Sequence, residues 1–449
     1  MENGEEGKIS ALDCADVTPE KAQAVGLHLG TVFRTVAVGR DTSPGSPAVC
    51  QALESGVTAA GADAVDAGIA PTPVLCYAYK GIDGCIVSIG CPDTYGGGIG
   101  ISVYGPDGAC IPSKRLEEIL GGDIGELPSY SGIGRIVTDS SANRRYTEGF
   151  ADEDLKNGGF AVLDCGCGSP SLCAPLALSE MGADVISLNA HMGEKTPPRS
   201  PGIGKADLAN LSDFVNASTG SIGLAYNGDG TRFALMDEGG KFVTGENLLA
   251  LMIRFLRPKV AVIPFGSSEA VEDAFWAPAL DYDRNPGEEE NRRIIRADGT
   301  LEAVTSAAAD NNADFAGMAD GTFIFPRRSM CPDGIYASAV ISCLAGQRSI
   351  RNILEDNPSY LNMSATVKFS GNTEIFGRRF LEEIRNYDIR EVAIGDGWKV
   401  VMKNGIYFVR QDQNDPKLLR INAESRDRVY LVSMLDQAVG ILENCTADH

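Results

Sequence analysis

Three cysteines lie close together in the sequence and could carry thiol or metal chemistry. Cys165, Cys167 and Cys173 have the spacing C-x-C-x5-C. Thiolates at the start of a helix can be reactive, but a structural metal site needs a fourth ligand, which this stretch does not offer. We therefore interpret these cysteines first as small side chains that fill a tight turn.

Histidine chemistry is nearly excluded. The chain has three histidines, His28, His191 and His449. His28 falls in a helical pattern, His191 in a predicted loop, and His449 is the last residue of the sequence. Ser-His-Asp catalysis and histidine-rich metal sites are therefore not favoured.

The segment VLDCGCGSP at 162–170 resembles the first motif of methyltransferases that use S-adenosylmethionine. In that motif a strand ends in an acidic residue, and glycines let the backbone approach the cofactor. The next predicted strand, ADVISLN, ends in Asn189, where an acidic residue would be expected to bind the ribose hydroxyls. A methyltransferase acting through this loop is kept as an alternative enzyme class.

The composition limits the partners. The formal net charge is -22, which disfavours nucleic acid and anionic membranes as partners, although a small anionic ligand could bind in a cleft with local basic residues. No apolar run is long enough for a membrane span, and MENGEEGKIS does not resemble a secretory signal. The 12 cysteines include several in apolar runs, such as Cys85 and Cys343, so we expect free thiols and a cytoplasmic location.

The 449 residues are too many for one core, so several domains are expected. Short apolar runs alternate with amphipathic stretches, which is typical of an α/β fold. A strand–helix–strand unit recurs three times and predicts similar domains at 1–150, 151–257 and 258–355. The segment 356–449, with a hairpin signal at Lys403–Asn404–Gly405 and a final helical pattern, predicts a small α+β domain. The charged segment 281–299 is expected to be an exposed loop.

The order of the motifs from about residue 18 to 440 resembles the α-D-phosphohexomutases, which include phosphoglucomutase, phosphomannomutase and phosphoglucosamine mutase. The motifs that carry the resemblance are VAVGRDTSPGSP, AGADAVDAGIAPTPVLCYA, GLAYNGDGTRFALMDEGG, ADGTFIF and GIYFVRQDQNDPKLLRINAES. The resemblance implies four domains around a central cleft. It also implies phosphoryl transfer between O1 and O6 of a hexose through an enzyme phosphoserine, with Mg2+ held by three aspartates and the phosphoserine.

The loop that matches the family's nucleophile motif T-A-S-H-N-P is Ser88 to Asp93. The serine position of the motif falls on Gly90, which has no nucleophile, and the histidine position falls on Cys91. Ser88 or Cys91 could replace the missing serine only with changed in-line geometry.

The loop that matches the family's metal motif D-G-D-x-D-R is 227–232. Asn227 and Thr231 replace two of the three aspartates, and Asp229 is retained. Because Mg2+ depends on anionic oxygen ligands, we expect its binding to be weak or lost. Arg232 could take over part of the role of the cation.

In the family's sugar motif G-E-x-S-G-H, the glutamate and serine are replaced here by Met318 and Asp320. Asp320 and Thr322 are the expected contacts to sugar hydroxyls.

In the phosphate motif R-P-S-G-T-E-P the arginine is retained as Arg410, but the Ser-Gly-Thr nest is absent. Lys417 and Arg420 follow, and with Arg410 they are the expected contacts for a small anionic ligand such as a sugar phosphate.

The sequence therefore predicts a phosphohexomutase-like protein of carbohydrate metabolism whose mutase reaction is lost or redirected. One alternative is an active intramolecular phosphotransferase that uses Ser88 or Cys91, and the second is the methyltransferase. A protein partner or a homo-oligomer is also compatible with a silent site.

Overall fold

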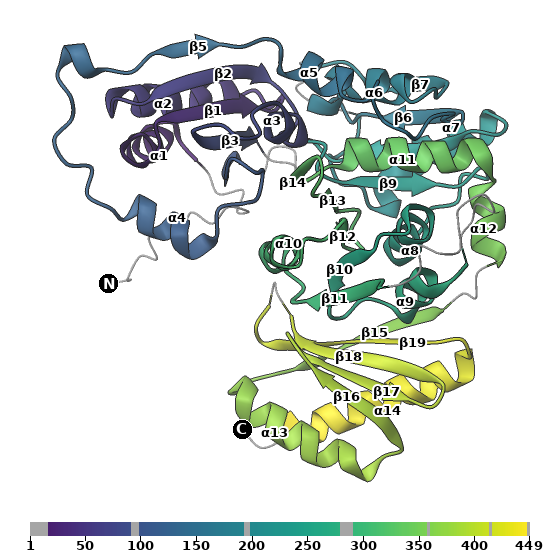
Figure 1. The fold of residues 1–449 in the computed structure, drawn as a ribbon. Coiled ribbons are helices and arrows are strands. Elements are labelled where there is room, and N and C mark those ends of the chain that lie inside the picture. The colour runs from purple at the N-terminus through teal and green to yellow at the C-terminus, as the bar shows by residue number, and fades with distance from the viewer. Residues whose placement is uncertain are drawn as a thin grey trace.

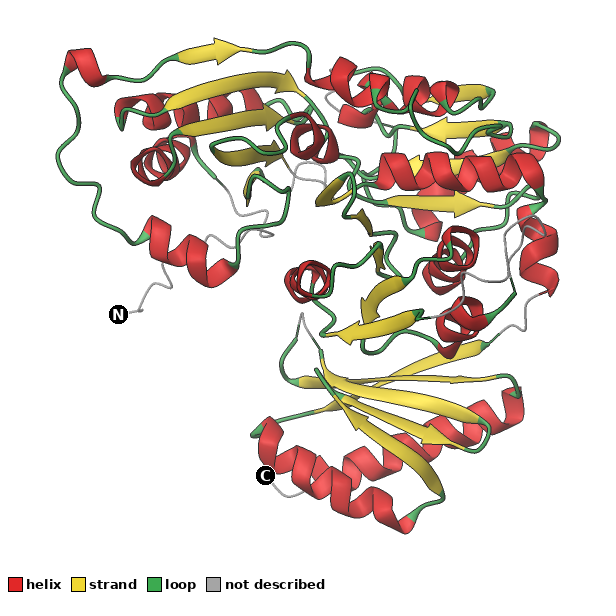
Figure 2. Cartoon of the chain, in the orientation of Figure 1, coloured by secondary structure: helices red, strands yellow, loops and turns green. Residues whose placement is uncertain are grey.

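The computed structural model describes residues 17–90, 98–192, 198–278, 291–356, 360–412 and 415–446. They form four β-sheets with helices packed against them (Figures 1 and 2), which confirms the α/β class. The predicted boundaries 1–150, 151–257, 258–355 and 356–449 stay a prediction. Within the described residues, no helix combines the length and apolarity that a membrane crossing requires.

The first sheet has the strand order β4-β3-β1-β2-β5, in which β4 is antiparallel to β3 and the other pairs are parallel. Its elements are α1 (Pro19–Val32), β1 (Thr35–Arg40), α2 (Ser46–Ala59), β2 (Asp63–Ile69), α3 (Thr72–Ala78), β3 (Gly84–Gly90), β4 (Gly100–Tyr104), α4 (Ser113–Leu120), a 3-10 turn (Tyr130–Gly132), β5 (Ile136–Thr138) and α5 (Ala142–Glu148).

Close packing of α1 on α2 depends on glycine. A Cβ on Gly26 would lie 2.1 Å from Leu53 O, and one on Gly56 would lie 2.1 Å from Gln23 O. Larger residues would push the two helices apart. The two glycines thus allow the backbones of α1 and α2 to approach each other closely.

The second sheet has the order β7-β6-β8-β9. Its elements are β6 (Ala161–Asp164), a 3-10 turn (Ser169–Leu172), α6 (Ala174–Glu180), β7 (Val185–Leu188), a 3-10 turn (Lys205–Leu208), α7 (Ala209–Ala217), β8 (Ile222–Tyr226) and β9 (Phe233–Met236).

The third sheet has the order β11-β10-β12-β13-β14. The elements of this part of the chain are α8 (Gly245–Leu256), β10 (Val260–Pro264), α9 (Glu269–Trp276), β11 (Arg293–Ala297), α10 (Leu301–Asp310), β12 (Phe315–Gly317), β13 (Phe323–Phe325), β14 (Ser329–Pro332), α11 (Gly334–Gln347) and α12 (Ile350–Asp356). The expectation of a loop over 281–299 is wrong for 293–297, which form the edge strand β11; residues 281–290 lie outside the described residues.

Helix α11 follows the third sheet in sequence but packs on the second, where it contacts α6, β8 and β9 (Figure 1). The helix is buried over most of its length. One apolar core runs without a break through the first three units, from Ala37 to Ile353. These three units are therefore firmly joined.

The fourth sheet has the order β15-β19-β18-β17-β16, and all of its pairs are antiparallel. Its elements are β15 (Leu361–Lys368), α13 (Thr373–Glu383), a 3-10 turn (Ile384–Asn386), β16 (Ile389–Ile394), β17 (Trp398–Met402), β18 (Gly405–Gln411), β19 (Leu418–Ser425) and α14 (Arg428–Thr446). It has a separate apolar core with α13 and α14, below the third sheet in Figure 1.

Candidate active site

A cavity of about 550 Å³ lies where loops of the first three sheets meet. The site residues predicted from the sequence that line it are Ser88, Asn227, Asp229, Thr231, Arg232, Asp320 and Thr322. Residues more than 200 positions apart in the chain are thus brought together, and Gly90 lines the same cavity. Cys91 lies outside the described residues.

Gly90 ends strand β3 and lies against the side chain of Asp41. A Cβ on Gly90 would be 2.6 Å from both Cγ and Oδ2 of Asp41. Asp41 is 6% exposed, and its carboxylate accepts hydrogen bonds from Ser43 N (3.0 Å), Ser43 Oγ (2.7 Å) and Ser46 Oγ. The carboxylate therefore occupies the space that a serine at position 90 would need.

Ser88 is connected to the loop 227–232 through Thr72, which sequence analysis did not identify as a site residue. The hydroxyl oxygens of Ser88 and Thr72 are 2.8 Å apart, and Thr72 Oγ1 donates to Asp229 Oδ2 at 2.7 Å. Because the single Thr72 proton goes to the carboxylate, Ser88 donates to Thr72. The one available signal was the position of Thr72 in the Pro-Thr-Pro turn between β2 and α3.

The side-chain oxygens of the loop 227–232 are bonded to one another. Asp229 Oδ1 accepts from Thr231 N (3.1 Å) and Thr231 Oγ1 (2.7 Å). Asn227 Nδ2 donates to Thr231 Oγ1 (3.0 Å), and Asn227 Oδ1 accepts from Arg232 N (3.0 Å). The loop thus offers Mg2+ a single carboxylate, Asp229, whose oxygens are already hydrogen-bonded, instead of the three carboxylates of the family motif.

Arg232 brings positive charge to the cavity and joins two loops. Its Nη1 lies 3.6 Å from Asp320 Oδ2, and its backbone forms an isolated β-bridge with Thr322. Asp320 Oδ1 also accepts from Thr322 N at 3.1 Å. The arginine charge is therefore partly neutralised by the loop that the sequence predicts to contact sugar.

A second cavity of about 320 Å³ lies between the third and fourth sheets. It shares Gly299, Met318 and Asp320 with the first cavity, so the two are adjacent. Arg410 lines it, with Nη1 3.8 Å from Asp396 Oδ2. Arg410 is therefore placed to contact a ligand that extends from one cavity into the other.

Lys417 and Arg420 line neither of these cavities. Arg420 is the cross-strand partner of Arg410, and its Nε and Nη2 lie 2.7 and 2.6 Å from Asp412 Oδ2. Lys417 is exposed, and its backbone N–H donates to Asp415 Oδ1 (2.9 Å). Of the three predicted anion contacts, Arg410 alone lies in the site.

Glu246 is a further acidic residue in the second cavity that sequence analysis missed. The pKa of Glu246 is raised to about 7, because burial and the nearby Glu424 carboxylate raise it more than a hydrogen bond from Ser268 N and the charge of Arg296 lower it. The junction of the third and fourth sheets therefore contains a carboxyl group that titrates near neutral pH.

Known proteins are similar to this chain in sequence and in architecture. Residues 2–122 match the family described as "Phosphoglucomutase/phosphomannomutase, alpha/beta/alpha domain I". A probable phosphoglucosamine mutase of Methanococcoides burtonii is 32% identical over 93% of this chain and 94% of its own, and one of Methanosarcina acetivorans is 31% identical over 92% and 93%. The chain belongs to the α-D-phosphohexomutase superfamily.

Solved phosphohexomutases have the same fold. A phosphoglucomutase/phosphomannomutase family protein of Burkholderia thailandensis superposes with a TM-score of 0.78, at 18% identity over 96% of this chain and 94% of that one. The open form of the Paramecium phosphoglucomutase parafusin gives 0.71, at 12% identity over 99% and 96%. The four sheets are thus arranged as in other members of the superfamily.

In this member of the superfamily, Asp164 of the loop 162–170 forms a buried ion pair with Arg199. Arg199 Nε is 2.8 Å from Asp164 Oδ2, its Nη2 donates to Tyr226 O at 2.8 Å, and Asn189 Nδ2 donates to Asp164 Oδ1 at 3.0 Å. A Cβ on Gly166 would lie 2.9 Å from Arg199 Nη2. The guanidinium group thus packs against the glycine that the methyltransferase motif would leave open for a cofactor.

The three cysteines of this loop, Cys165, Cys167 and Cys173, are buried free thiols. They do not form a three-ligand metal group in the described part of the chain. Burial raises the pKa of Cys165 to about 12. These observations favour the turn-filling interpretation over reactive thiolates.

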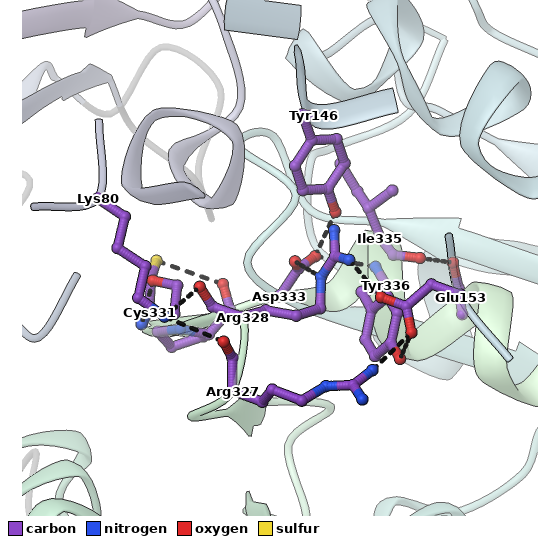
Figure 3. Close-up of polar contacts among 12 residues, drawn as sticks. Lys80, Tyr146, Glu153, Arg327, Arg328, Cys331, Asp333, Ile335 and Tyr336 are labelled. Atoms are coloured by element: carbon purple, nitrogen blue, oxygen red, sulfur yellow. Dashed lines mark hydrogen bonds and ion pairs between the residues drawn. The ribbon is translucent and has the colours of Figure 1, made fainter. Parts of the chain in front are cut away.

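Arg328, in the turn between β13 and β14, is surrounded by polar and aromatic side chains close to the cavity-lining residue Pro332 (Figure 3). Its Nη1 is 2.7 Å from Glu153 Oε1 and its Nε is 3.9 Å from Asp333 Oδ2. The guanidinium carbon lies 4.3 to 5.4 Å from the ring centroids of four aromatic residues: Tyr77, Tyr146, Phe150 and Tyr336. We call Arg328, its two acidic partners Glu153 and Asp333, and these four aromatic residues the arginine junction.

The arginine junction connects to the cavity through Asp333. Asp333 Oδ1 accepts hydrogen bonds from Tyr146 Oη (2.7 Å) and from Tyr336 N (2.8 Å) at the start of α11. The preceding residue, Pro332, lines the cavity, and the following one, Gly334, donates its N–H to Gly230 O (3.0 Å). The junction therefore fixes the loop 227–232 relative to the first and third sheets.

Proposed function

We propose that this protein binds a sugar phosphate in the two adjacent cavities and that it has lost or redirected the mutase reaction of its superfamily. The observation that carries the proposal is the contact between Gly90 and Asp41. A phosphoserine mechanism needs a hydroxyl at the end of β3, but the Asp41 carboxylate occupies the position where a side chain would begin. Without that group the covalent step has no acceptor.

The state of the loop 227–232 supports the same proposal. Mutase chemistry needs neutralisation of the charge on the phosphoryl group in the transition state. Here the retained Asp229 is bonded to Thr72 and Thr231, and Arg232 lies next to Asp320. The cleft therefore has less positive charge to offer than the superfamily reaction requires.

A mutase assay with glucose, mannose and glucosamine phosphates tests the loss of catalysis. The natural chain and Gly90→Ser are expected to stay at background, because groups that act as a unit are rescued little by restoring one of them. The triple variant with Asn227→Asp and Thr231→Asp is needed for any trace of activity. Robust turnover by the natural chain would reject the proposal.

Binding is tested separately by thermal shift with glucose 6-phosphate and N-acetylglucosamine 6-phosphate. A ligand of the native state raises the melting temperature. We expect the shift in the natural chain and in Arg420→Met, whose arginine is held by Asp412 outside the cavities, and its loss in Arg410→Met. Equal shifts in both variants would show that Arg410 does not hold the ligand.

A relocated acceptor is the second candidate function. If Ser88 Oγ attacked the phosphorus of a bound sugar phosphate, the bond between phosphorus and the sugar oxygen would break and the sugar would leave. The Ser88 proton would pass to Thr72, and the Thr72 proton to Asp229. Thr72→Val breaks this chain while keeping the shape of the side chain. Phosphorylation of Ser88 in the natural chain that is lost in Thr72→Val would favour this candidate.

We infer a cytoplasmic location from the cysteines. All ten cysteines of the described part of the chain are free, and nine of them are buried. Free thiols are typical of a reducing compartment.

A further inference from the structure

Three potential metal ligands lie together in the first unit, outside the cavities described above. Cys50 and Glu54 are four residues apart on helix α2, so they project from the same face. Asp66 lies on the neighbouring strand β2. One donor atom of each, the thiol sulfur and two carboxylate oxygens, lies within 4.8 Å of the others.

The burial of Glu54 is not explained by its protein partners. The residue is 3% exposed, and the one hydrogen bond to its carboxylate from the described residues comes from Cys50 Sγ, at 3.4 Å. A thiol is a weak donor. A buried carboxylate without a strong donor or counter-charge is costly, so a proton or a cation is needed at this position.

The surrounding charges compensate the Glu54 carboxylate only in part. Asp66 adds a second carboxyl group, and its Oδ1 accepts only one backbone hydrogen bond, from Gly68 N at 2.8 Å. The charge of Arg40 acts on Cys50 and Glu54 from a distance, but no ion pair or hydrogen bond joins Arg40 to either of them in the described part of the chain, and its Nη1 donates to Asp41 O at 3.3 Å. Within the described residues, the three ligand atoms thus face one another without an ion pair to a basic side chain.

We propose that Cys50, Glu54 and Asp66 form a binding site for a divalent transition-metal ion of the Zn2+ class. One thiolate and two carboxylates suit a borderline-soft cation, and water can complete a tetrahedral shell. Cys50 is 4% exposed, whereas Asp66 is partly exposed, so the ion enters from the Asp66 side. The bound ion ties α2 to β2, independently of the sugar-phosphate site.

Metal binding must release the proton of the Cys50 thiol, because the form of cysteine that binds a metal is the thiolate. At pH 7.5 the thiol proton leaves for the buffer when the metal–sulfur bond forms. Calorimetry in buffers of different ionisation enthalpy measures this release.

Titration of the chelator-treated full chain with Co2+ tests the site, because a thiolate bound to Co2+ gives a charge-transfer absorption band. We expect the band in the natural chain, its displacement by Zn2+ and a rise in melting temperature with Zn2+. Cys50→Ala should abolish the band, and the milder Asp66→Asn should weaken Co2+ binding at least about tenfold.

Two variants are controls. Cys85→Ala removes another buried cysteine of the same apolar core, whose raised pKa has burial as its only cause, and should leave the band unchanged. Asp229→Asn alters the sugar-phosphate site and should also leave it unchanged. No thiolate band, or a band that persists in Cys50→Ala, would overturn the proposal; the first result would mean that the group holds only a proton.

Discussion

Replacing Arg328 with methionine should destabilise the protein strongly, because it removes the cation of the arginine junction and leaves its acids buried. The side chains of Arg328, Glu153 and Asp333 are 5%, 8% and 6% exposed. Removing one partner of a buried ion pair costs about 3–5 kcal/mol, since the other charge is left uncompensated. The loss of contacts with the aromatic rings acts in the same direction.

The neighbouring Arg327 provides a matched control. It also pairs with Glu153, at 2.9 Å, but its side chain is 74% exposed. An exposed ion pair contributes about 0–1 kcal/mol, so Arg327→Met should change the free energy of unfolding little. Urea denaturation followed by circular dichroism compares the first transition of both variants with that of the natural chain.

The deficit of Arg328→Met should depend on pH. Burial raises the pKa of Asp333 and Arg328 lowers it, so removing the arginine raises the folded-state pKa further above the unfolded value. Folded protein then holds a proton that unfolded protein releases, and stability falls as pH rises. The deficit should be larger at pH 8 than at pH 5. A deficit equal to that of Arg327→Met at both pH values would refute the reasoning.

Three further predictions concern the site. The pKa of Glu246 is about 7 in the folded protein and 4.5 as a free group, so the free energy of unfolding falls by up to about 3 kcal/mol as the pH rises through this window. Glu246→Gln should therefore flatten the pH dependence of urea denaturation between these pH values. An unchanged pH dependence in the variant would contradict this prediction. Calorimetry should find at most weak Mg2+ binding, and micromolar affinity lost in Asp229→Ala would contradict the loop geometry. Gly90→Ala should lower the free energy of unfolding by about 1–3 kcal/mol, because the new Cβ would meet Asp41. As a control, Gly440→Ala on α14, where a Cβ has open space, should be neutral or stabilising. Equal effects of the two substitutions would exclude the clash at Gly90.

The sequence predicted the α/β fold and the loops that form the site, because each loop follows a strand with a recognisable apolar pattern. It missed β11, whose pattern RIIRA mixes arginine with isoleucine at a sheet edge. Nor does the sequence indicate that α11 packs on the second sheet, since an almost wholly apolar helix carries no local signal of the sheet that it contacts.

The site residues that the sequence missed act through distant partners. Asp41 excludes a side chain at Gly90, and Thr72 joins Ser88 to Asp229, a residue 157 positions away. No spacing rule connects such positions. Conversely, the sequence predicts that Arg420 contacts an anionic ligand. In the structure its guanidinium group is paired with Asp412 and does not line either cavity.

Intact-mass measurement after incubation with glucose 1,6-bisphosphate tests the central claim most directly, because it detects the covalent intermediate without requiring turnover. We predict no phosphorylated species for the natural chain, since Gly90 offers no acceptor and Asp41 fills the adjacent space. A stoichiometric gain of one phosphoryl group that peptide mapping assigns to Ser88 or Cys91 would contradict the account and establish a relocated nucleophile.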